Sequence, residues 1–235
     1  MPNLQVFDRI NNINGPKLRS MPYNQYFGEM RLTDEEKRER IALAERLEDV
    51  MMFLFYLIIS QDVYRTMSGE EIKRTFKQRL TNVIGTQVEI SPDIEAQIDE
   101  FADDTTDTTL EHLPILLSLY SDEGDKSEEK EKKKKSEQFY LSDDRARLLA
   151  EEQSNSIYQY SDYEKALRLG YKGKMWVTMR DPFVRRTHQR VDGKIIPIRE
   201  LFMVGDSFMR FPRDSRYGAS LKEISGCRCT IKFIK

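Results

Sequence analysis

Two stretches near the C-terminus, DPFVRRTHQRVDGK (residues 181–194) and GCRCTIKFIK (residues 226–235), hold most of the cysteine and histidine side chains of this chain. The 235 residues include only two cysteines and two histidines. Three of these four residues, His188, Cys227 and Cys229, fall in the two stretches. The fold of the C-terminal part is expected to bring them together in one small region that is rich in arginine.

His188, Cys227 and Cys229 offer one nitrogen and two sulfur ligands, a set that suits tetrahedral zinc with Asp181, Asp192 or water as the fourth ligand. In a strand, residues two apart point to the same side, so both cysteines can face His188. Their Cβ atoms would then lie about 6.5–7 Å apart, too far for a disulfide. A C-x-C spacing suits zinc less well than C-x-x-C, because it leaves no loop to wrap the metal.

Two other interpretations of the same residues stay open. Both cysteines can be small apolar core residues, with His188 hydrogen-bonded to Asp181. A cysteine paired with His188 can also act as a nucleophile, although no third group is evident in the sequence.

The arginines around this region suggest contact with a phosphate backbone. Asp181-Pro182 predicts a short helix over residues 182–190 with Asp181 as its N-cap. Guanidinium groups bind phosphate without reading bases. The predicted nucleic-acid-binding residues are Arg185, Arg186, Arg190, Arg199, Arg210, Arg213 and Arg216.

Charge is distributed unevenly along the chain. Residues 165–235 hold 17 lysines and arginines against 6 aspartates and glutamates, a net charge of +11, whereas residues 1–164 hold 21 against 34, a net charge of −13. Such a split predicts a basic module that meets an anionic partner and is carried on an acidic arm. Mutual attraction between the halves, or between neighbouring subunits, is the alternative.

The N-terminal half is predicted to be helical. Residues 1–32 are rich in proline and asparagine and predict an extended arm. Residues 33–121 predict a helical domain, with helix starts at Thr33, Ser68 and Ser91 and a first helix reaching about Thr66. The apolar part of that helix, residues 41–66, must be covered by its own bundle or by a second copy of the chain. Residues 122–138 form a charge run that predicts a solvated linker or a long exposed connection between helices.

Residues 139–235 predict a compact α+β domain. Helices are expected from Ser142 and from Ser161 to Gly170, followed by short strands in KMWVTMR, DSFMRFP and CRCTIKFI. The fold class is therefore α+β, a helical arm or bundle followed by a small domain with short strands.

Composition argues against a membrane protein or a disulfide-stabilised one. The start of the chain lacks the features of a signal peptide. The most apolar run, residues 50–59, is only ten residues long, about half of what spans a bilayer. Two cysteines spaced C-x-C favour a reducing compartment.

The ordered series of motifs in residues 140–235 resembles the phage head morphogenesis family, the minor head proteins related to protein F of phage Mu. The segment DDRARLLA resembles the helix before the family's motif, and the chain departs from the usual pattern at residues 151–153 and at Gly226. The matching positions are Trp176, Thr178, Asp181, Arg185, His188, Gly193, Phe202, Gly205, Pro212, Asp214, Cys227, Arg228 and Cys229.

The resemblance implies a structural protein of the virion, not an enzyme. It would join the head at low copy near the portal, with portal, capsid and scaffold proteins as partners, after assembly in the host cytoplasm. The basic domain would face packaged double-stranded DNA, and zinc is the only cofactor that the residues suggest. The alternatives are a packaged enzyme of the nuclease or transferase type, and a cellular module that binds nucleic acid without sequence preference.

Overall fold

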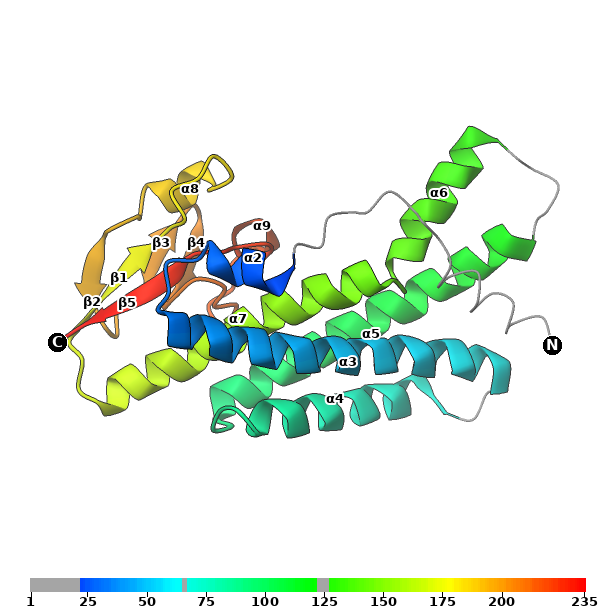
Figure 1. Ribbon diagram of the computed structural model, residues 1–235, viewed down its shortest axis with the longest axis horizontal. Helices are drawn as coiled ribbons and strands as arrows, with labels where there is room; N and C mark the ends of the chain where they lie inside the picture. The colour runs from blue at the N-terminus through cyan, green and yellow to red at the C-terminus, as the bar shows by residue number, and fades with distance from the viewer. Residues whose placement is uncertain (1–21, 65–66, 122–126) are drawn as a thin grey trace. The chain divides into compact units, whose positions relative to one another are not determined.

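The computed structural model describes residues 22–64, 67–121 and 127–235 (Figure 1). Most of the predicted extended arm lies outside the described residues. Within its last part, Tyr23–Gly28 form a short helix, α2, in which Tyr23, Tyr26 and Phe27 are buried. The end of the predicted arm is therefore a helical turn anchored by aromatic side chains.

The chain divides into two compact units. One, here called the helical unit, contains the described residues within 45–86 and 95–150. The other, here called the α+β unit, contains residues 22–44, 87–94 and 151–235. The prediction of an α+β protein with a helical N-terminal region is confirmed.

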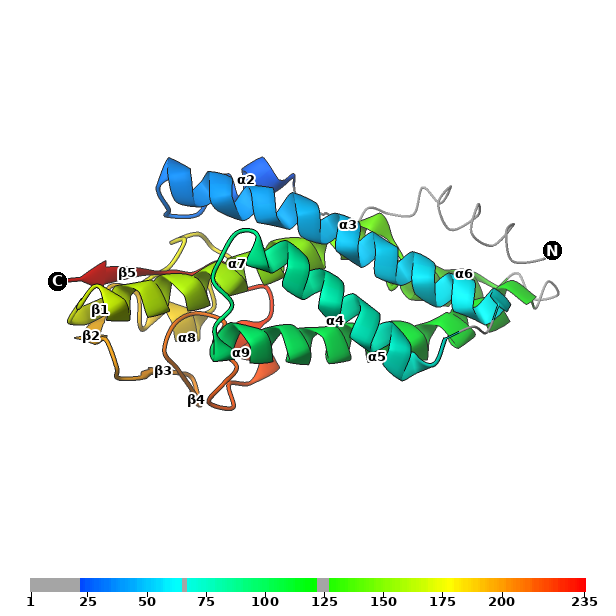
Figure 2. The ribbon, with the colours of Figure 1, turned by 90° about the horizontal axis from the view of Figure 1, so that it is seen from below.

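The helical unit is built from most of α3 (Asp34–Tyr64), from α4 (Gly69–Gly85), from most of α5 (Pro92–Ser121), from α6 (Glu128–Phe139) and from the start of α7 (Asp143–Arg168). Figures 1 and 2 show α4 beside α3 and α5, and ring contacts join α4 to both, Arg79 over Phe53 and Phe76 against Phe101. Ile72, Phe76, Leu80 and Ile84 form the buried stripe of α4. Their i, i+4 spacing is that of one helix face.

The predicted helix starts are confirmed by their caps. Thr33 and Glu36 hydrogen-bond reciprocally at the start of α3, and Ser68 and Glu71 form the same capping box at α4. The Ser91 hydroxyl accepts from the Ile94 N–H at the start of α5. Each side chain satisfies backbone donors that the first turn of a helix leaves unpaired.

The apolar part of α3 is partly covered within the chain. Met51, Leu54, Phe55 and Ile58 are at most 1% exposed, while Tyr56 remains 56% exposed. Association of two copies through residues 41–66 stays a prediction.

Two predicted features differ in the structure. Residues 128–138 of the expected linker lie in α6, because Ser127 caps a run of glutamate and lysine, which are strong helix formers. The expected break at Ser161 is absent, and α7 runs unbroken to Arg168. Tyr160 and Tyr163 on either side of Ser161 both contact Phe211, so tertiary packing keeps this segment helical.

Five short strands form the sheets of the α+β unit. An antiparallel sheet has the order β2-β1-β5, from β2 (Ile195–Pro197), β1 (Gly173–Val177) and β5 (Thr230–Ile234). Its register pairs Val177 with Thr230. A separate hairpin pairs β3 (Phe202–Val204) with β4 (Ser207–Met209).

The core of the α+β unit lies around Trp176, which is fully buried. Side chains from the strands and the loops between them surround it, so Trp176 anchors β1 in this core. The buried cluster consists of Trp176, Val191, Ile196, Phe202, Val204, Met209, Cys227 and Cys229. Both cysteines are thus part of the core that the strands build.

No helix among residues 22–64, 67–121 and 127–235 is long and apolar enough to cross a membrane.

Candidate metal centre

The structure brings His188, Cys227 and Cys229 together. One ligand atom from each, with all three residues buried, lies within 4.8 Å of the other two. His188 Nδ1 lies 3.5 Å from the Cys227 sulfur and 3.4 Å from the Cys229 sulfur. Residues 181–194 and 226–235 therefore meet in one three-residue cluster, here called the Cys2His cluster.

His188 comes from α8 (Arg186–Gln189), a single turn of helix. The predicted helix over residues 182–190 is shorter than expected, and Asp181 is not its N-cap. Instead, the Asp181 carboxylate accepts from the Phe183 N–H two residues on, and Arg185 occupies the cap position. Residues 181–184 thus form a turn before α8.

Cys227 and Cys229 immediately precede β5, after a turn in which Gly226 has a φ of +63°. A non-glycine residue is disfavoured at this φ. Arg228 lies between the cysteines and points away from them, since it pairs with Asp181 and with Glu29. The alternation expected for extended backbone holds, because both sulfurs face His188 and the intervening side chain does not.

Glu223 fixes the orientation of the imidazole. His188 Nε2 lies 3.1 Å from Glu223 Oε2, and the same oxygen accepts from the Thr187 hydroxyl at 2.8 Å. Glu223 lies on α9 (Leu221–Ile224) and its side chain is 4% exposed. A Cβ at Gly205 would lie 2.8 Å from Glu223 Oε1, so glycine at that position leaves room for the carboxylate.

The two thiols have opposite protonation tendencies. A hydrogen bond from Cys229, followed by the interaction with His188, lowers the pKa of Cys227 well below its usual value even though burial opposes ionisation. The pKa of Cys229 is raised, first by the hydrogen bond to Cys227 and then by burial. Cys227 is thus the first thiol of the pair to ionise.

A small cavity of about 70 Å³ borders the Cys2His cluster. Its wall includes His188 and both cysteines, together with Phe183, which is 85% exposed. The remaining lining residues are Met179, Val184, Arg185, Gly226 and Arg228. A volume of this size holds at least one water molecule beside the cluster.

Neither aspartate suggested from the sequence belongs to the Cys2His cluster. Asp181 is engaged by Arg228 and by the Phe183 N–H. Asp192 accepts from the Thr178 N–H and from Arg180 Nε, each at 2.8 Å. Burial opposes the ionisation of Asp192, yet these hydrogen bonds lower its pKa. The carboxylate beside His188 is Glu223, which was not expected.

The seven predicted nucleic-acid-binding arginines separate into two groups. Arg210 is buried and bound to Asp214 and Asp93, and Arg213 pairs with Glu152. Arg185 is half-buried and donates to the Ser225 carbonyl. The exposed members are Arg186, Arg190, Arg199 and Arg216, of which Arg216 also pairs with Asp93.

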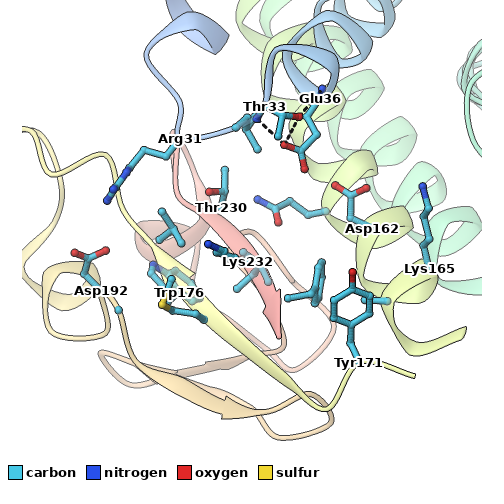
Figure 3. Close-up of a pocket in the computed structure, with 18 of the residues that line it drawn as sticks. Arg31, Thr33, Glu36, Asp162, Lys165, Tyr171, Trp176, Asp192, Thr230 and Lys232 are labelled. Atoms are coloured by element: carbon cyan, nitrogen blue, oxygen red, sulfur yellow. Dashed lines mark hydrogen bonds between the residues drawn. The ribbon is translucent and has the colours of Figure 1, made fainter. Parts of the chain in front are cut away.

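A second, larger hollow of about 610 Å³ lies elsewhere in the α+β unit (Figure 3). Its wall combines the start of α3, the end of α7 and strands β1 and β5. Arg40 and Asp162 form an ion pair of 2.8 Å in this wall. Among the predicted site residues only Asp192 lines the hollow. The labelled side chains are Arg31, Thr33, Glu36, Asp162, Lys165, Tyr171, Trp176, Asp192, Thr230 and Lys232.

The sequence did not predict the contact of Glu223 with His188 and Thr187, nor the hydrogen bonds that Asp214 accepts. Asp214 is fully buried and accepts from the backbone and guanidinium of Arg210 and from the Tyr160 hydroxyl. The sequence gives one indication of a buried carboxylate: Glu223 is flanked mainly by small and apolar residues in SLKEISGC (residues 220–227). The partners of these carboxylates lie tens of residues away, so spacing did not identify them.

Comparison with known proteins identifies the C-terminal part of the chain. Residues 122–232, just under half of the chain, match the model of the Phage Mu protein F like protein family. An NAD(+)–arginine ADP-ribosyltransferase of Enterococcus faecalis is 33% identical over 78 residues, which are 33% of this chain and 15% of that protein. No solved structure matches the chain. The resemblance seen in the sequence is thus confirmed for residues 122–232, which are similar to the Phage Mu protein F like family.

Proposed function

We propose that the chain is a minor head protein that joins the phage head at low copy beside the portal and contacts packaged double-stranded DNA through its α+β unit. The family match over residues 122–232 carries the proposal of a head protein. Location in the virion follows from the same match. The portal contact and the DNA contact are finer proposals that rest on charge and exposure.

The excess positive charge of residues 165–235 supports the DNA contact. Three of the seven predicted arginines are buried or half-buried and engaged within the unit, so the proposed contact is confined to the four exposed ones, Arg186, Arg190, Arg199 and Arg216. Arg186 and Arg190 lie four residues apart at the two ends of α8, a spacing that places them on one helix face. Such a pair suits two phosphates of a backbone, without base reading.

DNA binding is tested with the full chain and a fluorescent duplex. We expect affinity to fall about 100-fold between 50 and 200 mM salt if four phosphates are contacted, because each contact releases condensed counterions. The double substitution Arg186→Ala and Arg190→Ala should lower the salt slope by about 2. Arg180→Ala is the matched control, since Arg180 is exposed but paired with Asp192. Salt-independent or sequence-selective binding contradicts the proposed backbone contact.

The portal contact is tested by cross-linking mass spectrometry of heads. The heads are assembled by co-expressing the chain with the portal, major capsid and scaffold proteins of the genome that encodes it. We expect cross-links between the acidic residues 1–164 and portal subunits. Cross-links to the major capsid protein alone would place the chain away from the portal.

A packaged transferase is the alternative function, because the matched relative in Enterococcus faecalis is named as an ADP-ribosyltransferase. The chain spans only 15% of that protein. We therefore expect the full chain to transfer no ADP-ribose from NAD to arginine-containing acceptors. Measurable transfer that survives purification would support the enzyme instead of the structural protein.

A further inference from the structure

We propose that His188 Nδ1 and the thiolates of Cys227 and Cys229 bind one zinc ion, with water from the adjoining cavity as the fourth ligand. This inference goes beyond the proposed function, because it needs neither a head nor DNA. It assigns the cluster a structural role, in which the metal ties α8 to the segment that leads into the C-terminal strand.

The distances in the cluster agree with a tetrahedral metal. Zinc binds sulfur at about 2.3 Å and imidazole nitrogen at about 2.0–2.1 Å, so tetrahedral geometry separates a sulfur from the nitrogen by about 3.5 Å. The two separations from His188 Nδ1 are 3.5 Å to Cys227 and 3.4 Å to Cys229. Both nitrogen–sulfur separations are thus compatible with one shared ion, and all three ligand atoms lie within 4.8 Å of one another.

Hydrogen bonding determines which imidazole nitrogen can bind a metal. Glu223 Oε2 already accepts from the Thr187 hydroxyl and faces His188 Nε2, so the carboxylate requires the proton on Nε2. The lone pair of the neutral ring is then on Nδ1 and faces two sulfurs at once. One lone pair can accept one S–H proton, whereas one metal ion can bind the nitrogen and both sulfurs.

Glu223 supplies the outer partner that metal-binding histidines commonly have. A carboxylate that accepts from the second ring nitrogen fixes the tautomer and makes the ligand more basic. Glu223 is almost fully buried, and Gly205 leaves room for it. The Thr187 hydroxyl and His188 Nε2 offset the cost of burying this carboxylate.

The fourth ligand is assigned to water because the nearby aspartates are engaged elsewhere. Asp181 pairs with Arg228 and Asp192 with Arg180. The cavity of about 70 Å³ directly adjoins all three protein ligands. Two thiolates and one imidazole form a soft donor set that favours zinc over magnesium or calcium. Binding releases the thiol protons to solvent.

The experiment measures metal in the untagged full chain. After dialysis against metal-free buffer, we expect elemental mass spectrometry to find about one zinc ion per chain. Zinc should be lost when a mercurial reagent modifies the thiols. Cobalt added to the stripped chain should give intense thiolate-to-cobalt charge transfer and the ligand-field bands of a tetrahedral ion. A chain that retains no zinc and shows no such bands with stoichiometric cobalt overturns the proposal.

Variants separate ligation from packing. Cys227→Ser and Cys229→Ser should each abolish the cobalt charge-transfer spectrum or sharply weaken it. Val204→Ala is the matched core control, since Val204 is fully buried in the same cluster but carries no ligand atom. It should lower the midpoint of thermal unfolding while keeping one zinc per chain. Loss of zinc in Val204→Ala, with native tryptophan fluorescence retained, would contradict direct ligation by the cysteines.

Glu223→Gln tests the outer partner. We expect its zinc affinity, measured by competition with a chelating dye, to fall 10- to 100-fold. Glu200→Gln is the matched control, because Glu200 is exposed in the same unit. Equal zinc affinities for the two variants would contradict the proposed role of Glu223 in orienting His188. A zinc-free chain that still enters heads would refute the metal site and leave the head protein proposal intact.

Discussion

The helical unit and the α+β unit differ in what they bury. In the helical unit the buried stripe of α4 is apolar, and the described buried polar residues are few, among them Thr105, Thr109 and Arg145. In the α+β unit a much larger set of polar and charged side chains is buried. That set includes Arg40, Gln153, Asn155, Lys174, His188, Arg210, Asp214 and Glu223.

The kind of side chain that each unit buries determines how well that unit tolerates substitution. An apolar helix face depends on shape and area, and a neighbouring side chain can partly fill a lost methyl group. A buried charge depends on a particular partner atom, and removing one partner leaves the other uncompensated. The α+β unit should therefore be the less tolerant of the two, and its single tryptophan, Trp176, reports on it by fluorescence.

The largest effect is expected from Asp214→Asn. Asp214 is fully buried and accepts from Arg210, Arg216 and Tyr160. Neutralising it leaves the Arg210 guanidinium without its main partner, and we expect a loss of about 3–5 kcal/mol in the free energy of unfolding. Urea unfolding followed by Trp176 fluorescence measures it. The exposed Asp206→Asn serves as control and should change stability by less than about 0.5 kcal/mol.

A core deletion in the helical unit is expected to have a somewhat smaller effect. Leu80 is fully buried on α4, and Leu80→Ala should cost about 2–5 kcal/mol. Far-ultraviolet circular dichroism during urea unfolding measures it, with the exposed Asn82→Ala as control. A loss for Leu80→Ala clearly greater than that for Asp214→Asn would reverse the comparison between the units.

Lys174→Met is predicted to stabilise the α+β unit. Lys174 is fully buried and its ammonium lies over the rings of Tyr163 and Phe202. Burial, with repulsion from Arg210, lowers the pKa of Lys174 to about 7. At pH 7 the methionine variant should be more stable by about 1–3 kcal/mol, because it removes a buried charge.

The same lysine predicts a pH dependence of stability. Between pH 7 and 10 the unfolded chain keeps the lysine proton while the folded chain loses it, so stability should rise with pH. The slope should reach up to about 1.4 kcal/mol per unit. Urea unfolding at pH 7.5, 8.5 and 9.5 should show this rise in the wild type and a weaker one in Lys174→Met. Identical slopes would mean that Lys174 stays charged when folded.

The smallest effect is expected at a helix cap. Ser68→Ala removes the hydroxyl that accepts from the Glu71 N–H at the start of α4, and should cost about 1 kcal/mol. Thermal unfolding by circular dichroism measures the cost. Ser118→Ala is the matched control, since the Ser118 hydroxyl only donates to a carbonyl within its own helix. Equal losses of stability in the two variants would show that the Ser68 cap does not stabilise α4.

The local features of the fold could be predicted because their causes are local. Thr33, Ser68, Ser91 and Ser142 each begin a helix with a partner three residues away. The predictions of secondary structure that were wrong have tertiary or compositional causes. Tyr160 and Tyr163 hold α7 together across a serine that resembles a start signal. Strands β2 and β3 are three residues long, too short for an alternating pattern.

The candidate site was predictable only in part for the same reason. The C-x-C spacing placed both sulfurs on one side, and the scarcity of histidine and cysteine pointed to His188. Glu223 reaches His188 across 35 residues of chain. Arg210 and Arg213 are directed inward by carboxylates on other segments. Such pairings depend on how α8, α9 and the loops pack against one another. A short sequence motif cannot predict that packing.

The central claim, that this chain is a head protein, is tested most directly by absolute quantification in purified heads. Heads assembled with the portal, major capsid and scaffold proteins of the same genome are purified by density, and each chain is counted with isotope-labelled peptides. We predict a few copies of this chain per head, in constant ratio to the portal. Heads that assemble normally and contain none of it would contradict the claim.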